Sequence, residues 1–171
     1  WPLATRKFQW ILDKFNPPDW SVTRGCIFYT HNELDEKIAK PVRDQLTKIS
    51  KEKNISIVCS SLRKMDFGTS SVRFPTMKKG FVTMFKQILG ALEKSRDNII
   101  FFTEHDVLYP ISHFDFTPPK DDIFYYNAHV WRWKYPDNLA ITYDRLISLS
   151  GLCVNREFAL NHYKQRLKKV A

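Results

Sequence analysis

Two carboxylates stand two residues apart after a short apolar stretch. Residues 99–102 are apolar, and Glu104, His105 and Asp106 follow shortly after them. Because side chains alternate along an extended chain, Glu104 and Asp106 are predicted to face one way and His105 the other. An acidic pair beside a bound phosphate needs a cation between them, and Mg²⁺ and Mn²⁺ accept both kinds of oxygen. The triplet therefore indicates a divalent-metal site; the alternative is an acid-rich turn that only ends a strand.

The elements before this triplet predict an α/β fold. Three apolar stretches are predicted as buried strands, namely 25–30, 55–60 and 98–103. A helix that Pro41 opens follows the first strand, a long polar loop (61–76) follows the second, and an amphipathic helix (81–92) precedes the third. Strands that alternate with helices imply right-handed crossovers and a parallel sheet. Ligands of such sheets bind beyond the carboxyl ends of the strands, which is where the acidic triplet lies.

The second half of the chain has a different pattern. Short strands without intervening helices are predicted at 123–127, 140–143 and 149–154. Asn155 is expected to cap a final helix that continues through Leu167. The 171 residues therefore predict one domain, with an α/β first half and an α+β second half.

Composition narrows the choice of partner. Lys and Arg total 27 against 18 Asp and Glu, a net charge of +9, which favours nucleotide phosphates, nucleic acid or an acidic membrane surface. No apolar stretch approaches the roughly 20 residues of a bilayer span. The three cysteines are an odd number with wide spacing, so they predict neither a disulfide framework nor a zinc site. We expect a cytoplasmic protein with buried thiols that contacts an anionic membrane peripherally, if at all.

The run 99–106, at the end of the third predicted strand, resembles the D-x-D region of glycosyltransferases with the GT-A fold. The resemblance covers roughly residues 26–162 and depends on the order of elements, with Glu-His-Asp in place of Asp-x-Asp. It implies a single GT-A-like domain with a Rossmann-like, mostly parallel sheet between helices. Its parts would be an N-terminal extension (1–24), a nucleotide-binding half (25–106) and an acceptor half (107–171). The start at Trp1 and the basic helical end are typical of a trimmed chain, so we expect that C-terminal functional residues are missing.

The same resemblance implies a metal-dependent, hexosyltransferase-type reaction. A UDP- or GDP-linked nucleotide-diphospho sugar would be the donor, and a hydroxyl of a glycan, a lipid-linked compound or another molecule would be the acceptor. Mn²⁺ or Mg²⁺ would be held directly by Asp106, with Glu104 as ligand, water-mediated partner or ribose contact. His162 is a further candidate ligand, although an ordinary, partly exposed helical histidine is the interpretation that its position favours.

The resemblance also implies donor contacts. The loop after the first strand would hold the nucleoside, through Tyr29, Thr30, His31, Asn32 and Glu33. Asp66 or Arg73 would lie beside the base or ribose, and Arg73, Lys78 or Lys79 near the diphosphate. The alternative for the loop is a turn that caps the next helix, and the alternative for the basic residues is simple solvation.

On the acceptor side, Trp131, Arg132 and Trp133 are expected to form an aromatic platform, the alternative for the rings being the core. Asp144 or Glu157 is the candidate base that deprotonates the acceptor, although the helix dipole explains Glu157 as well.

Two other functions stay open. A nucleic-acid-binding or DNA-modifying protein would use the charge and the aromatics. A sugar-phosphate nucleotidyltransferase would need a glycine-rich phosphate loop, and residues 29–33 contain no glycine.

Overall fold

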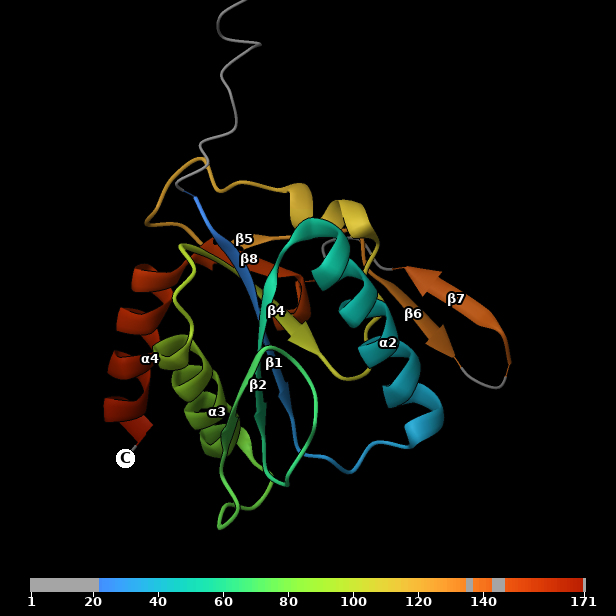
Figure 1. Ribbon diagram of the computed structural model, residues 1–171, viewed down its shortest axis with the longest axis horizontal. Helices are drawn as coiled ribbons and strands as arrows, with labels where there is room; N and C mark the ends of the chain where they lie inside the picture. Colours follow the sequence, from blue (N-terminus) through green and yellow to red (C-terminus); the bar gives the residue numbers. More distant parts are fainter. Residues whose placement is uncertain (1–21, 135–136, 143–146, 171) are drawn as a thin grey trace, which may run out of the picture.

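The computed structural model describes residues 22–134, 137–142 and 147–170 (Figure 1). The described elements are, in chain order, β1 (Arg24–Thr30), α2 (Glu36–Lys53), β2 (Ser56–Ser61), β3 (Ser70–Arg73), α3 (Phe81–Lys94), β4 (Ile99–Glu104), η1 (Ile111–Asp115), β5 (Tyr125–Tyr126), β6 (Trp131–Lys134), β7 (Leu139–Thr142), η2 (Leu149–Gly151), β8 (Leu152–Asn155) and α4 (Arg156–Val170). Within these ranges, no helix has the length and apolar character needed to cross a membrane.

Six strands form the central sheet, in the order β3-β2-β1-β4-β8-β5. The first four are parallel to one another, whereas β8 runs antiparallel to both β4 and β5. The predicted α/β class with a mostly parallel central sheet is therefore confirmed. Strands β5 and β8 come from the second half of the chain, so both halves contribute to the same sheet.

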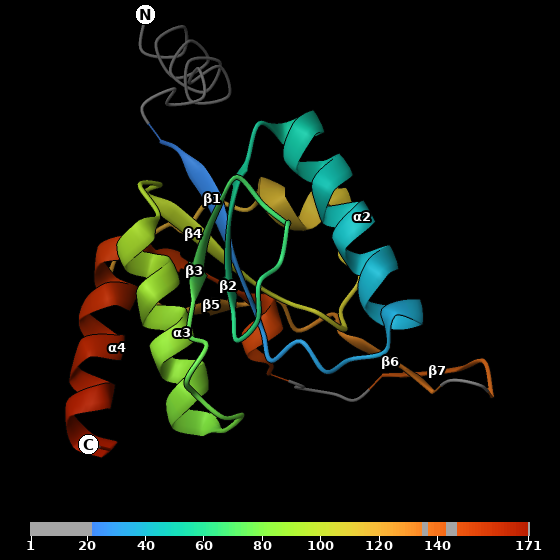
Figure 2. The same ribbon diagram turned by 60° about the horizontal axis from the view of Figure 1, so that its bottom comes forward.

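Helices cover both faces of this sheet, with α2 on one side and α3 and α4 on the other (Figures 1 and 2). The alternation of side chains along β1 explains the two layers. Cys26 and Phe28 pack into the cluster that contains the buried face of α2, whereas Ile27 and Tyr29 pack into the cluster of α3 and α4. Strands buried on both faces read as continuous apolar runs, which is why β1, β2 and β4 were recognisable from sequence.

The helix α2 begins five residues before Pro41, which corrects the predicted start. Asp35 is its N-cap, and the Asp35 carboxylate accepts a hydrogen bond from the backbone N–H of Lys37 at 2.9 Å. Pro41 lies in the second turn of the helix, so it has no N–H to donate to the carbonyl four residues earlier and is an interior residue of the helix, not its start. The acidic cap is thus a stronger start signal than the proline.

The predicted loop 61–76 contains a strand that the sequence did not reveal. β3 pairs in parallel with β2 at the edge of the sheet, and its side chains alternate between half-buried and exposed. With only Val72 apolar, this strand lacks the apolar run that marks its neighbours. In the second half, β5, β7 and β8 overlap the predicted strands, and β6 is additional. Asn155 caps α4 as predicted, accepting from the backbone N–H of Glu157 at 2.9 Å.

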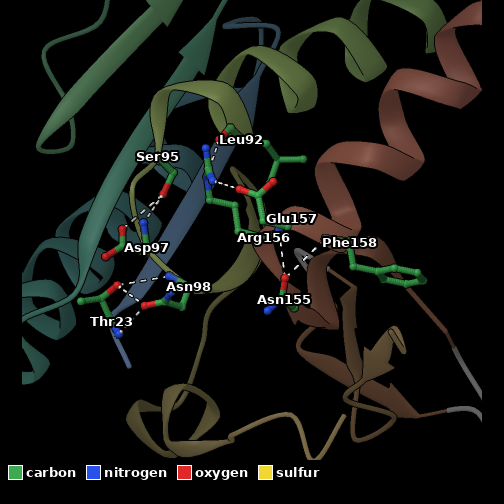
Figure 3. A network of polar contacts seen from close by, with 9 residues as sticks. All are labelled: Thr23, Leu92, Ser95, Asp97, Asn98, Asn155, Arg156, Glu157 and Phe158. Carbon is green, nitrogen blue, oxygen red and sulfur yellow. Dashed lines mark hydrogen bonds and ion pairs between the residues drawn. The ribbon is translucent and has the colours of Figure 1, made fainter. Parts of the chain in front are cut away.

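Polar side chains tie the amino ends of β1 and β4 to the start of α4 (Figure 3). The amide oxygen of Asn98 accepts from the backbone N–H and the hydroxyl of Thr23, at 3.1 and 3.0 Å. The Arg156 backbone N–H donates to the Asn98 carbonyl at 2.8 Å, and its Nε donates to the Leu92 carbonyl at 3.0 Å. This network lies at the edge of the sheet opposite the acidic triplet, so it joins the strand starts and α4 without involving the triplet.

Candidate active site at the carboxyl edge of the sheet

Two neighbouring strands bring their last residues together. β1 and β4 pair so that Tyr29 lies opposite Glu104, and the Tyr29 hydroxyl donates to Glu104 Oε1 at 2.5 Å. The Tyr109 hydroxyl accepts from the backbone N–H of Glu104 at 3.0 Å. Both tyrosines are buried, so buried rings fix Glu104 at two points: Tyr29 at its carboxylate and Tyr109 at its backbone N–H. Tyr29 and Glu104 were separate candidates in the sequence, and the register of β1 on β4 brings them into contact.

The Glu104 carboxylate is in an unusual electrostatic position. Burial raises its pKa above the ordinary value and nearby Asp106 raises it further, whereas the hydrogen bond from Tyr29 and the field of His105 lower it. Burial and the adjacent carboxylate likewise raise the pKa of Tyr29 well above its usual range. Two carboxylates that repel each other are stabilised when a cation binds between them.

Two histidine rings meet beside this pair. His31 and His105 lie with ring centroids 4.8 Å apart in an edge-to-face arrangement. The Nδ1 atom of His31 accepts from the backbone N–H of Glu33 at 3.1 Å, which assigns the proton of the neutral ring to Nε2. Burial, His105 and Lys79 lower the pKa of His31 and outweigh Glu33 and Asp106, which raise it, so the net effect favours the neutral ring. His105 Nδ1 is buried without a hydrogen-bond partner among the described residues.

A cavity of about 320 Å³ opens on the α3 side of this edge. All three residues of the acidic triplet border it, together with residues from the end of β1 and the start of α3. The lining residues are Tyr29, Thr30, His31, Lys79, Gly80, Phe81, Met84, Gln87, Glu104, His105 and Asp106. The predicted alternation that would turn His105 away from its neighbours does not hold, because the strand ends at Glu104 and the chain then turns.

A second cavity, of about 350 Å³, lies on the α2 side and has a more polar lining. Its lining residues are Phe28, Thr30, Asn32, Leu34, Glu36, Ala39, Arg43, Arg63, Lys64, Met65, Asp66 and His105. Thr30 and His105 border both cavities, so the two are neighbours at the ends of β1 and β4.

The loop after β1 is fixed by Asn32. Its backbone has the left-handed conformation, with φ of 62°, which asparagine tolerates better than most residues. Its side-chain Oδ1 accepts from the backbone N–H groups of Leu62 and Arg63, both at 2.9 Å, and so ties the loops after β1 and β2 together. Asn32 was predicted as a nucleoside contact; it borders the second cavity, but its amide oxygen is already engaged in this bridge.

Several predicted donor contacts reach the two cavities and others do not. Asp66 borders the second cavity and Lys79 the first. Lys78 contributes its backbone carbonyl to a hydrogen bond from Thr83 at 2.6 Å, and neither Lys78 nor Arg73 borders either cavity. Arg73 is the last residue of the edge strand β3.

Glu157 is not positioned to act as the predicted base. Asn155 pairs with Ile99 at the beginning of β4, so Glu157 lies at the opposite end of that strand from Glu104. Its carboxylate forms an ion pair with Arg156 in the network of Figure 3. The helix-terminus role that the sequence left open for Glu157 is the one its position supports.

The remaining metal-ligand and acceptor-side predictions fall outside the two cavities or outside the described residues. The His162 ring packs against Phe124 and Tyr163, with centroids 4.9 and 5.3 Å away, and does not border either cavity. Among the described residues, no three His, Cys, Asp or Glu side chains form a group that could hold a metal ion. Trp131, Arg132 and Trp133 lie on β6, outside the central sheet. Asp144 lies outside the described residues.

Sequence reasoning missed residues that shape the site. Gln87, on the buried face of α3, donates through Nε2 to the carbonyls of Thr30 at 2.8 Å and Ser60 at 3.2 Å, and so clamps the ends of β1 and β2. A polar residue within the apolar stripe of a helix is the signal that could have revealed it. Phe81, the first residue of α3, borders the first cavity with 79% of its surface exposed.

Comparison with known proteins adds no relative to these observations. No protein-family model matches the chain, and no curated protein matches it. The geometry at the carboxyl ends of β1 and β4 is therefore the basis on which a function is proposed.

Proposed function

We propose that this chain is a metal-dependent glycosyltransferase that moves a sugar from a nucleotide-diphospho sugar to an acceptor hydroxyl. The observation that carries the proposal is the position of Glu104 and Asp106 at the carboxyl end of β4, where both border the first cavity and a second cavity lies next to it. Ligands of parallel α/β sheets bind at this edge. The order of the elements, which resembles the GT-A fold, supports the same choice.

The carboxylates fit a hard divalent cation such as Mn²⁺ or Mg²⁺. Glu104 is half-buried with Oε1 occupied by Tyr29, and Asp106 is exposed at the cavity. Two carboxylates without a third protein ligand suit an ion that completes its coordination with substrate phosphate and water oxygens. Such a cation, when bound, neutralises the charge that develops on the departing nucleoside diphosphate.

The chain supplies further groups for the diphosphate. Lys79 borders the first cavity, and α3 begins directly beyond it with Gly80 as its N-cap. The first turn of α3 contains no acidic residue and no capping side chain, so its positive end is uncompensated by side chains. Lys79 and this helix end would hold phosphate oxygens opposite the carboxylates, on the other side of the cation.

The second cavity supplies polar groups for the nucleoside end of the donor. Asp66, Arg63 and Lys64 border it, and one acceptor and two donor side chains suit the hydrogen-bonding edge of a base or a ribose. Thr30 and His105 would lie under the connection between the two ends of the donor. The role of the chain in the transfer is then to fix the anomeric carbon against an acceptor hydroxyl.

A thermal-shift screen of UDP-, GDP-, CMP- and dTDP-sugars, with and without Mn²⁺, tests the proposal. A ligand at 100 times its Kd stabilises the folded state by about 2.7 kcal/mol. For a chain of this length, that corresponds to a rise in Tm of about 5 to 10 °C. We expect one class of nucleotide sugar to give this shift only in the presence of Mn²⁺.

Asp106→Asn should abolish the Mn²⁺-dependent shift and the transfer activity while leaving the Tm of the free protein unchanged. Asp44→Asn is the matched control, because Asp44 is an exposed helical residue paired only with Lys40. A shift that Asp106→Asn leaves intact would refute the metal role. Stabilisation by DNA or RNA without metal, and by no nucleotide sugar, would instead favour a nucleic-acid-binding protein.

A further inference from the structure

The β6–β7 ribbon is set apart from the rest of the molecule. It forms a two-stranded antiparallel sheet of its own, and every residue of both strands is exposed. In both views the ribbon lies on the α2 side of the central sheet and extends beyond it, away from α3 and α4 (Figures 1 and 2).

The register sorts the ribbon's side chains onto two faces. Trp131 pairs with Thr142, and Trp133 pairs with Ala140, so one face carries two indole rings and no charge. Arg132 pairs with Ile141 and Lys134 with Leu139 on the reverse face. Trp131 and Trp133 are 66% and 62% exposed, which excludes the alternative that these rings belong to the core.

The ribbon exposes several large apolar side chains. Fourteen such side chains are exposed among the described residues, and four of them, Trp131, Trp133, Leu139 and Ile141, lie on the ribbon itself. Exposed apolar surface gathered on one element is typical of an interaction site. An isolated two-stranded hairpin is also only marginally stable in water, so a surface that covers one face would stabilise it.

Charge decides which partner suits the ribbon. The chain carries +9, so packing the tryptophan faces of two copies together would bring like charges close. Within residues 131–142 the cations Arg132 and Lys134 outnumber the single acid, Asp137, which pairs with Lys134 at 2.6 Å. Tryptophan beside Arg, Lys and branched aliphatic residues is the combination that lies at the boundary between lipid headgroups and acyl chains.

We propose that the β6–β7 ribbon docks this protein on an anionic lipid bilayer. Trp131 and Trp133 enter the headgroup region, and the positive charge of the chain attracts anionic lipids. This inference goes beyond the proposed enzymatic function and does not depend on it. It gives Trp131 and Trp133 a role that does not require them to border either cavity.

Vesicle sedimentation tests the inference. The full chain is mixed with vesicles of phosphatidylcholine containing 30% phosphatidylserine, or of phosphatidylcholine alone, at low and high salt. We expect binding to the anionic vesicles that weakens steeply with salt. The double variant Trp131→Ala/Trp133→Ala should lower the partition coefficient at least about tenfold, whereas Leu108→Ala, which removes an exposed apolar side chain outside the ribbon and both cavities, should leave it unchanged.

Ala140→Asp adds a second, independent perturbation, since it places a carboxylate on the tryptophan face opposite Trp133. It should reduce binding as the double variant does, and urea unfolding of each variant establishes that the fold is retained. Unchanged binding by both variants would overturn the inference, and so would no binding by the unaltered chain at low salt. If the unaltered chain associates with itself and the double variant does not, the tryptophan face binds a second copy of the chain and not a bilayer. Nucleotide-sugar binding is measured separately, so failure of the proposed function leaves the vesicle result interpretable.

Discussion

Replacing His113 by phenylalanine should make the free energy of unfolding of this protein depend less on pH below pH 7. His113 lies in η1 and is 9% exposed. Its ring packs against Phe101, Tyr109 and Phe114, with centroids between 5.0 and 5.5 Å away. Its Nδ1 atom lies 3.2 Å from the Asn127 amide nitrogen, an arrangement that suits the neutral ring with its proton on Nε2. Nε2 is buried without a partner among the described residues.

The size of the effect follows from the pKa of this ring. Burial lowers the pKa of His113 from its ordinary value of 6.5 to about 4. Below pH 6.5 the unfolded chain therefore binds a proton that the folded chain does not, so stability is complete above that pH and is lost as the pH falls toward 4. The His113 ring should account for a loss of about 2 kcal/mol between pH 7 and pH 5, and on the order of 3 kcal/mol below pH 4.

Urea unfolding at pH 7, 6 and 5 measures this difference. The unaltered chain and His113→Phe should differ in the slope of unfolding free energy against pH, since only the former contains the buried histidine. Loss of the contact to Asn127 shifts the variant's stability equally at every pH and does not alter that slope. His129→Phe is the matched control, because His129 is exposed. Parallel profiles for the unaltered chain and His113→Phe would refute the reasoning.

Three further changes test the candidate site. Tyr29→Phe removes the hydrogen bond that lowers the pKa of Glu104, so Glu104 should become protonated at a higher pH. As the pH is lowered, Mn²⁺-dependent nucleotide binding should therefore weaken earlier in this variant than in the unaltered chain, which calorimetry over a pH series measures. Gln87→Leu removes the hydrogen bonds to the buried carbonyls of Thr30 and Ser60, so it should lower the free energy of unfolding in urea by about 1 to 3 kcal/mol. A change within experimental error would show that these hydrogen bonds do not stabilise the fold. Asn32→Ala should cost about 1 to 3 kcal/mol, whereas Asn32→Asp, which keeps an acceptor oxygen, should cost less; equal losses would discount the bridge between the two loops.

The sequence by itself determined the features that depend on neighbouring residues. The apolar runs of β1, β2 and β4 and the periodic apolar face of α3 follow from local burial patterns, and Asn155 announces α4 because its cap is a local hydrogen bond. The same local reasoning located the acidic triplet at the end of a strand. It failed for β3, because a half-exposed edge strand has no apolar run, and for the start of α2, where a capping aspartate competed with a proline.

Only the tertiary structure decided which of the candidate residues meet. The pairing of β1 with β4 places Tyr29 against Glu104 across 75 residues of chain, and nothing in either segment encodes that register. Antiparallel pairing of β8 with β4 carries Glu157 to the far end of the sheet, although its residue type suits a base. The tryptophans of β6 likewise have the composition of a core but lie on an isolated ribbon. Chemistry at a site requires groups a few ångströms apart, and such distances are set by long-range packing, which local patterns do not specify.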